Sequence, residues 1–96
     1  MTDELTALFR PQSVAVVGAS DDQDKYGHKV FRNIIDGGFQ GRLYPVNPNA
    51  TTVLGRPSCP SLKAIPERLD LAFIVIPARL VVDAVREAVE ADVRGL

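Results

Sequence analysis

The chain has 96 residues, of which 46% are hydrophobic and 24% charged, and its formal net charge is −1. These values predict one small globular domain, and the near balance of 11 basic and 12 acidic residues gives no electrostatic case for nucleic acid binding. No apolar run approaches the roughly 18 residues that a membrane span needs, and no signal peptide is indicated. The single Cys59 excludes an internal disulfide, has no second cysteine for a metal site and fits a reducing compartment. We therefore expect a cytoplasmic protein without nucleic acid or membrane partners.

The first third of the chain predicts a strand, a loop and a helix. A short helical turn over residues 4–9 precedes an apolar strand over residues 13–17. The strand breaks into Gly18-Ala19-Ser20, and after a polar loop the apolar residues recur at helical spacing over residues 27–36. A buried strand that opens into glycine and small residues before a helix is typical of a phosphate site built from backbone amides.

The middle of the chain predicts a second strand and a turn. Gly37 and Gly38 provide a left-handed end for the first helix, and a short strand follows over residues 42–46. The cluster Asn47-Pro48-Asn49 then forms a turn, because proline fixes φ and asparagine side chains bind the nearby backbone. Residues 51–54 are expected to form a third, weak strand.

The last third predicts a buried strand and a covering helix. Residues 61–65 read as one helical turn capped by Ser61, and residues 71–76 form a continuous apolar strand of the kind that helices cover on both faces. Pro77-Ala78 ends that strand, and a helix starts at Leu80. Its apolar stripe comprises Val81, Val85, Ala88 and Val89.

This order of elements predicts an α/β fold: a three-layer, Rossmann-like, doubly wound parallel sheet. Its ligand crevice lies beyond the carboxyl ends of the strands, where the loops at residues 18–20, 47–49 and 77–78 meet. The chain stops where this topology would begin another strand, so we expect residues 1–96 to be the truncated N-terminal part of a longer protein. Alternatively, another segment or chain covers the open edge beside residues 71–76.

The sequence lacks two common nucleotide-binding motifs, the dinucleotide-binding motif and the Walker-type loop. A dinucleotide site requires Gly-x-Gly-x-x-Gly after the first strand and an acidic residue at the end of the second. Here Gly18 is followed by no such glycines before Gly27, and the second strand ends in Val46-Asn47. No Walker-type loop is present either, so neither NAD binding nor nucleoside triphosphate hydrolysis is expected.

The chain nevertheless resembles a known family along nearly its whole length. It resembles the CoA-binding domain of NDP-forming acyl-CoA synthetases, which is related to the α subunit of succinyl-CoA synthetase. The segments that carry the resemblance are residues 8–20, Lys25-Tyr26-Gly27, Tyr44-Pro45-Val46-Asn47-Pro48-Asn49, Leu54-Gly55, Pro60-Ser61-Leu62 and residues 70–78. This domain binds coenzyme A with a Rossmann-like fold, which agrees with the absence of the dinucleotide-binding motif from the sequence.

The resemblance implies a CoA site on the first loop and helix entry. Gly18, Ala19 and Ser20 would wrap the phosphates or pantetheine with backbone amides and the Ser20 hydroxyl. Lys25 would neutralise a phosphate, and Gly27 belongs to the same motif. From the residues alone, Gly18 and Gly27 also read as turn glycines that permit positive φ.

The other two loops would complete the site. Asn47, Pro48 and Asn49 would line the second side of the crevice, with the alternative that both asparagines are only turn formers. Relatives often carry lysine where Asn49 stands, so a charge contact is missing here. Pro77 and Ala78 would offer a small apolar surface to the adenine.

No catalytic site is expected in this segment. The related synthetases pass phosphate through a histidine of a later domain, so His28 reads as a partly exposed helix residue. No nucleophile, base and orienting group occur together, and no metal site is expected. The resemblance implies that the parent protein converts acyl-CoA, ADP and phosphate reversibly into acid, CoA and ATP.

Three functions remain open at this point. The first is a CoA-binding domain of an ADP-forming acyl-CoA synthetase, whose partners are CoA or acyl-CoA and further synthetase domains or subunits. The second is a stand-alone, non-catalytic CoA-binding protein, and the third is a regulatory CoA-binding domain of a protein acetyltransferase. Self-association through the open sheet edge is also expected.

Overall fold

The computed structural model describes residues 11–95, with the exception of the Ala78 side chain. The helical turn predicted over residues 4–9 lies outside the described residues. The elements, in chain order, are β1 (Ser13–Val17), α2 (Tyr26–Asp36), β2 (Arg42–Val46), β3 (Thr52–Val53), β4 (Arg56–Pro57), η1 (Leu62–Ala64), β5 (Leu71–Ile74) and α3 (Ala78–Glu90).

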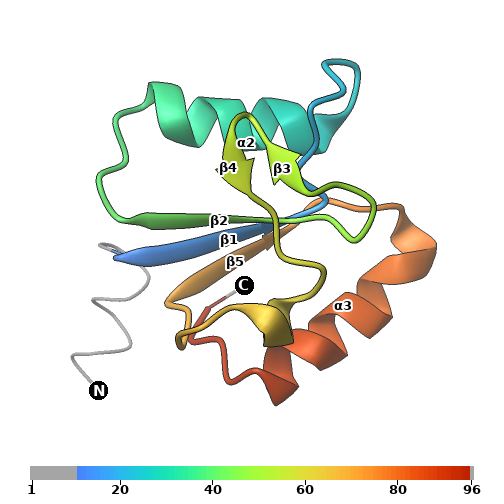
Figure 1. The fold of residues 1–96 in the computed structure, drawn as a ribbon. Helices are drawn as coiled ribbons and strands as arrows, with labels where there is room; N and C mark the ends of the chain where they lie inside the picture. The colour runs from blue at the N-terminus through green and yellow to red at the C-terminus, as the bar shows by residue number, and fades with distance from the viewer. Residues whose placement is uncertain (1–10, 96) are drawn as a thin grey trace.

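β1, β2 and β5 form a parallel sheet in the order β2-β1-β5. The register pairs Val17 with both Val46 and Ile74, so the three strands reach their carboxyl ends together. α2 covers one face of this sheet, and α3 with η1 covers the other (Figure 1). The predicted three-layer, Rossmann-like α/β fold is confirmed.

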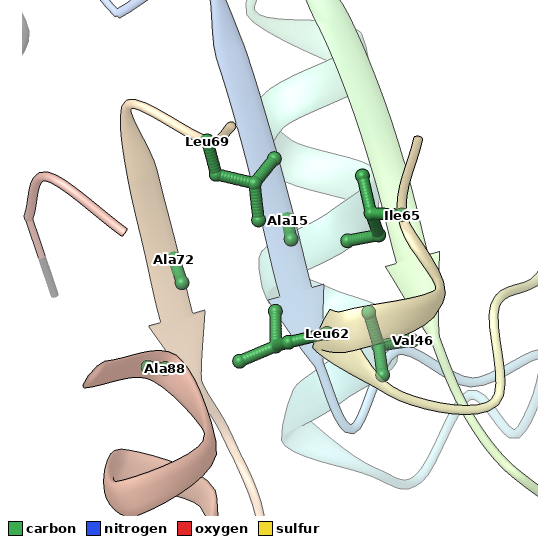
Figure 2. Close-up of a cluster of buried hydrophobic side chains, with 7 residues drawn as sticks. All are labelled: Ala15, Val46, Leu62, Ile65, Leu69, Ala72 and Ala88. Atoms are coloured by element: carbon green, nitrogen blue, oxygen red, sulfur yellow. The ribbon is translucent and has the colours of Figure 1, made fainter. Parts of the chain in front are cut away.

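Two apolar clusters fill the space between the layers. The α3 side holds the cluster drawn in Figure 2: Ala15, Val46, Leu62, Ile65, Leu69, Ala72 and Ala88. The α2 side holds Val14, Val16, Ala19, Phe31, Leu43 and Val53. β1 contributes to both clusters because successive side chains of a strand point to opposite faces. This explains why its sequence is apolar throughout instead of alternating.

The weak strand predicted over residues 51–54 is wrong as a member of the parallel sheet. β3 pairs antiparallel with β4 in a separate hairpin, whose turn passes through Leu54 and Gly55 at φ values of 49° and 78°. Val53 anchors the hairpin by packing into the α2-side cluster. A strand of two residues carries too little periodicity to reveal its partner in the sequence.

The end of α2 is built on one left-handed glycine, not on two. Gly37 has a right-handed φ of −73°, whereas Gly38 has a φ of +82°. The Phe39 N–H donates to the Ile34 carbonyl at 3.3 Å, and the Gly38 N–H donates to the Ile35 carbonyl at 3.0 Å. This pair of bonds is the Schellman motif, which requires the left-handed residue one position after the helix cap.

The helical turn predicted at residues 61–65 forms, but its predicted cap is wrong. The Ser61 side chain makes no capping hydrogen bond to η1. Instead, the Leu62 N–H donates to Oε1 of Glu87 at 2.8 Å, so a carboxylate from α3 satisfies the start of η1. A cap that lies 25 residues away in sequence leaves no local signal.

α3 begins two residues earlier than predicted and buries a narrower face. It starts at Ala78 instead of Leu80, immediately after Pro77. Ala88 is buried against the sheet, whereas Val89 is 70% exposed, so the prediction that Val89 belongs to the buried stripe is wrong. Consecutive residues of a helix point about 100° apart, which turns Val89 away from the sheet that Ala88 contacts.

β5 is shorter and less covered than predicted. It ends at Ile74 instead of residue 76, although the Val75 N–H still donates to the Val17 carbonyl at 2.8 Å. The prediction of helices over both faces is wrong for Phe73, which is 39% exposed. On the outer edge of β5, the Ala72 N–H donates to the Gly95 carbonyl at 2.9 Å. Within residues 11–95, no helix is long and apolar enough to cross a membrane.

Candidate ligand site at the carboxyl ends of the strands

The loop after β1 contacts the ends of both neighbouring strands. The Gly18 N–H donates to the Val46 carbonyl at 3.0 Å, at the end of β2. On the other side, a Cβ added to Gly18 would lie 2.0 Å from the Val75 carbonyl oxygen and 2.9 Å from Cγ2 of Ile76. The structure therefore brings the first loop against the beginnings of the other two predicted loops.

Gly18 and Gly27 meet backbone to backbone. A Cβ on Gly27 would lie 1.7 Å from the Gly18 carbonyl oxygen, which no side chain can occupy. Gly18 itself has a φ of +98°, a conformation that favours glycine. Gly18 therefore fits the interpretation as a turn glycine of positive φ. For Gly27 that interpretation is wrong, because Gly27 is not among the glycines of positive φ; it is required by the approach of the α2 N-terminus to the loop.

Asn47 connects the second loop to the first. Its Nδ2 donates to the Ala19 carbonyl at 3.0 Å, and its Oδ1 accepts from the Asn49 N–H at 2.8 Å. Both ends of this side chain are thus used inside the protein. The turn-forming role is present in the structure, and Asn47 also shapes the first loop with one of its two Nδ2 hydrogens.

The first loop and the start of α2 expose backbone donors. Within residues 11–95, the N–H groups of Ser20 and Asp21 donate to no protein acceptor, and neither do those of Tyr26 and Gly27 at the start of α2. α2 has no acidic residue in its first turn and no side-chain cap at Lys25. Free donors at the positive end of a helix form an environment suited to an anion.

The side chains of this loop are mostly engaged with its own backbone. The Ser20 hydroxyl accepts from the Asp22 N–H at 3.0 Å and keeps its proton for a further bond. Oδ1 of Asp22 accepts from the Asp24 N–H at 3.0 Å. Lys25 is exposed. The three carboxylates at positions 21, 22 and 24 make the side chains of the loop mainly acidic, so the groups here that suit an anion are the N–H groups and Lys25.

The remaining predicted residues lie around this centre. The Ala19 side chain is fully buried in the α2-side cluster, so only its backbone faces the loop. Pro48 and Asn49 are exposed in the second loop, and Pro77 is exposed at the start of α3. Ala78 is the first residue of α3, and its side chain lies outside the described part.

Two residues at this site were not predicted. His28 is only 8% exposed, so its interpretation as a partly exposed helix residue is wrong. Its Nδ1 lies 2.9 Å from the Ser20 carbonyl oxygen. Asp21 accepts from the Leu54 N–H at 2.7 Å and ties the β3–β4 hairpin to the loop. The second contact spans 33 residues and has no sequence signal; the first spans eight residues across the helix entry.

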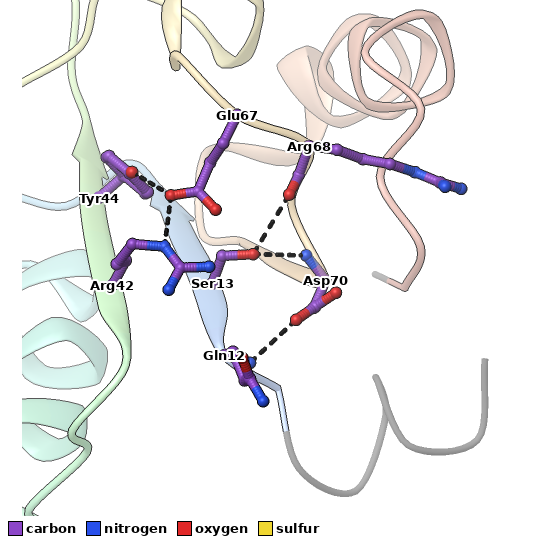
Figure 3. A network of polar contacts seen from close by, with 7 residues as sticks. All are labelled: Gln12, Ser13, Arg42, Tyr44, Glu67, Arg68 and Asp70. Carbon is purple, nitrogen blue, oxygen red and sulfur yellow. Dashed lines mark hydrogen bonds and ion pairs between the residues drawn. The ribbon is translucent and has the colours of Figure 1, made fainter. Parts of the chain in front are cut away.

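One group of shifted pKa values lies at the opposite end of the sheet. Glu67 accepts from Nε of Arg42 at 2.6 Å and from the Tyr44 hydroxyl (Figure 3). These two bonds lower the pKa of Glu67, with Arg42 as the larger cause, and the bond to Glu67 raises the pKa of Tyr44. Arg42 and Ser13 start their strands, so this cluster stabilises the amino ends of the sheet and takes no part in the candidate site.

Comparison with known proteins gives the family. The sequence profile of the CoA-binding domain matches residues 12–96. The chain is 47% identical over 88 residues to acetate–CoA ligase (ADP-forming) I of Archaeoglobus fulgidus, a match that covers 92% of this chain and 13% of the ligase. The chain thus spans a small part of the ligases that it matches.

Solved structures agree with this result. A dinucleotide-forming acetyl-coenzyme A synthetase 1 of Ca. Korarchaeum cryptofilum, in complex with phosphate and ADP, matches 95% of this chain with a TM-score of 0.90 and 36% identity, over 20% of its own length. A conserved hypothetical protein of Pyrococcus furiosus matches 83% of this chain with a TM-score of 0.76 and 32% identity, over 67% of its own length.

The match covers the strand, loop and helix that build the candidate site, together with the hairpin and the third strand. The predicted resemblance and its ligand, coenzyme A, are thereby confirmed at the level of the family. This chain belongs to the CoA-binding domain family, in the form found in ADP-forming acyl-CoA synthetases.

Proposed function

We propose that this chain binds coenzyme A at the carboxyl ends of β1, β2 and β5, as the CoA-binding domain of an ADP-forming acyl-CoA synthetase. One observation carries the proposal: the unpartnered N–H groups of Ser20 and Asp21 lie next to the uncapped N-terminus of α2 in a chain of this family. Phosphate oxygens are the ligands that such donors favour.

The residues present fit this group. Gly18 and Gly27 let the start of α2 approach the loop closely, and the Ser20 hydroxyl retains a proton to donate. Lys25, exposed at the helix entry, supplies a positive charge for a CoA phosphate. We propose that Pro48, Asn49, Pro77 and Ala78 line the rim of the same site, with the last two next to the adenine.

The chemistry of CoA indicates which step of the reaction this domain serves. When bound, CoA supplies the thiol that carries the acyl group, and this domain holds and orients it. We propose that activation of the acid and transfer of phosphate take place on further synthetase domains or subunits, so that this segment alone is non-catalytic. A cytoplasmic location accords with that role and stays a prediction.

Calorimetric titration with CoA, dephospho-CoA and NAD tests the proposal. We expect CoA to bind most tightly and NAD not to bind. The difference in affinity between CoA and dephospho-CoA gives the contribution of the 3′-phosphate to binding. Because the three carboxylates of the loop repel the phosphates of CoA and salt screens this repulsion, we expect the affinity to rise slightly between low and moderate salt.

Lys25, which directly precedes α2, and Lys29, in its first turns, provide a matched pair for this titration. Lys25→Ala, at the helix entry, should weaken CoA binding about threefold, the effect of one exposed charge contact. Lys29→Ala should leave it unchanged, since Lys29 lies over the Tyr26 ring at 5.3 Å on the outer surface of the helix. NAD binding as tightly as CoA, or equal effects of the two variants, would refute the proposed site.

A second candidate is a stand-alone CoA-binding protein. The Pyrococcus furiosus relative favours it, because this chain covers 67% of that protein and only 13% of the ligase. Immunoblotting of a native extract separates the two. A band at the size of about 96 residues supports the stand-alone protein, and a much larger polypeptide supports the synthetase. The acetyltransferase alternative stays a prediction.

We also propose that the isolated chain self-associates through β5. Its outer edge is met by the Gly95 carbonyl at one position, and Phe73 beside it is 39% exposed. Exposed strand edges with apolar neighbours pair readily with another chain.

A further inference from the structure

His28 and Asn47 hold two consecutive peptide units of the first loop. Nδ1 of His28 lies 2.9 Å from the Ser20 carbonyl oxygen, and Nδ2 of Asn47 donates to the Ala19 carbonyl at 3.0 Å. His28 lies in the first turn of α2 and Asn47 directly follows β2, so the two side chains reach the loop from different parts of the chain.

The proton on His28 follows from its partner. A carbonyl oxygen can only accept a hydrogen bond, so Nδ1 must carry the proton in this contact. The neutral imidazole meets this requirement with its proton on Nδ1, and no charge is needed. The side chain is 8% exposed, so the ring is fixed by its surroundings as well as by this bond.

Because the peptide bond is planar, a hydrogen bond to a carbonyl group also fixes the direction in which the N–H of the next residue points. Every peptide bond in the described residues is trans, so each carbonyl points opposite to the N–H of the next residue. The bond from Asn47 to the Ala19 carbonyl therefore turns the Ser20 N–H away from Asn47. The bond from His28 to the Ser20 carbonyl turns the Asp21 N–H away from His28 in the same way.

These two amides are the loop donors that have no protein partner within residues 18–22. We propose that His28 and Asn47 are positioning residues, which grip the Ser20 and Ala19 carbonyls and so aim the Asp21 and Ser20 N–H groups at the phosphate of the ligand. This inference rests on the proposed function and adds to it the residues that preorganise the loop. Preorganised donors avoid the entropy loss of ordering the loop when the ligand binds.

Two substitutions of His28 separate the hydrogen bond from the volume of the ring. In His28→Asn the amide Nδ2 occupies the position of Nδ1, so the donor is kept while the ring volume is lost. In His28→Leu the donor is lost while most of the buried volume is kept. We expect the affinity of His28→Asn for CoA to lie within about threefold of the wild-type value. His28→Leu should bind CoA about tenfold more weakly, which corresponds to the loss of one hydrogen bond from the Asp21 N–H to a charged phosphate.

Stability should follow the opposite order, because the smaller asparagine leaves a cavity that leucine fills. A purely structural role for His28 would instead make affinity and stability fall together. Asn47→Asp changes the other peptide unit: it keeps the acceptor for Asn49, removes the donor to Ala19 and adds a negative charge. Because that charge also repels phosphate, we expect CoA binding to weaken by more than about tenfold.

Amide NMR of the ligand-free protein tests the positioning without CoA. In the wild type and in His28→Asn, the Asp21 amide should be as rigid as the neighbouring strand, whereas in His28→Leu its ¹⁵N heteronuclear NOE should fall. A rigid Asp21 amide and unchanged CoA affinity in His28→Leu would overturn the inference, as would His28→Asn behaving like His28→Leu. If no variant binds CoA but Asp21 loosens as expected, the proposed function fails and the positioning stands.

Discussion

At the scale of single residues, the site depends on the contact between Gly18 and Gly27. Gly27→Ala would place its Cβ 1.7 Å from the Gly18 carbonyl oxygen, and the backbone on either side is held by β1 and α2. We expect a loss of about 3 kcal/mol in the free energy of unfolding, at the upper end for overpacking, together with loss of CoA binding. Urea unfolding followed by circular dichroism measures it.

Gly37→Ala is the control for that substitution. Gly37 has an ordinary φ of −73°, and the nearest atom to its added Cβ is the Asn33 carbonyl oxygen at 3.1 Å. Its unfolding free energy should change by less than about 1 kcal/mol. If Gly27→Ala were as stable as Gly37→Ala, the close approach of α2 to the loop would be incorrect.

Single residues also differ in how clearly the amino-acid sequence indicates their roles. Gly18 and Gly27 stand out because a strand and a helix must join through them, and both occupy the predicted place. The roles of His28 and Asn47 do not stand out, because their partners are carbonyl groups, which every residue possesses. Only the three-dimensional path of the backbone selects Ser20 and Ala19 as those partners.

At the scale of elements, the polar cluster at the amino ends of β1 and β2 sets a pH dependence. The pKa of Glu67 lies below its ordinary value of 4.5 in the folded chain, so its contribution to stability is present above that pH and is lost as the pH falls through the folded pKa. The pKa of Tyr44 lies above 10.0, so its contribution is present below pH 10.0 and is lost as the pH rises through the folded pKa.

Substitutions in this cluster should therefore change the pH dependence of stability. Glu67→Gln should act on both sides of neutral pH, because Glu67 also raises the pKa of Tyr44, whereas Tyr44→Phe should act mainly on the alkaline side. Glu67→Gln should lower the melting temperature at pH 7. It should also reduce the decrease in melting temperature that the wild type shows as the pH drops below 4.5. Tyr44→Phe should reduce the decrease in melting temperature at alkaline pH. The decrease at acid pH should partly remain, because Arg42 still binds Glu67. Melting curves from about pH 2 to about pH 11 measure both; an unchanged acid limb in Glu67→Gln would contradict the assignment.

The elements also show where sequence patterns suffice. β1, β2 and α2 follow from apolar runs and helical spacing, and their observed bounds differ from the predicted ones by at most one residue. The β3–β4 hairpin and the cap of η1 do not follow, because Val53 and Glu87 act through contacts with distant elements. Local patterns describe a strand or a helix, but tertiary contacts decide which short segments pair.

At the scale of the whole molecule, the outer edge of β5 predicts concentration-dependent association, because within residues 11–95 it makes one backbone hydrogen bond, from the Ala72 N–H to the Gly95 carbonyl. Phe73→Ser should shift sedimentation velocity profiles toward the monomer, because it removes exposed apolar surface beside that edge. Val89→Ser is the control, since Val89 is 70% exposed on α3. Equal effects of both substitutions, or a wild type that is monomeric at every concentration, would contradict association through β5.

The loop amides of Ser20 and Asp21 are where we propose that CoA meets the chain. The most direct test is a ¹H–¹⁵N correlation spectrum of the wild-type chain recorded during titration with CoA. We expect the largest shifts on Ser20, Asp21 and the first residues of α2, while Arg42 and Glu67 at the other end of the sheet stay unchanged. Shifts centred on that other end, or no shifts in a folded protein at millimolar CoA, would contradict the proposed site.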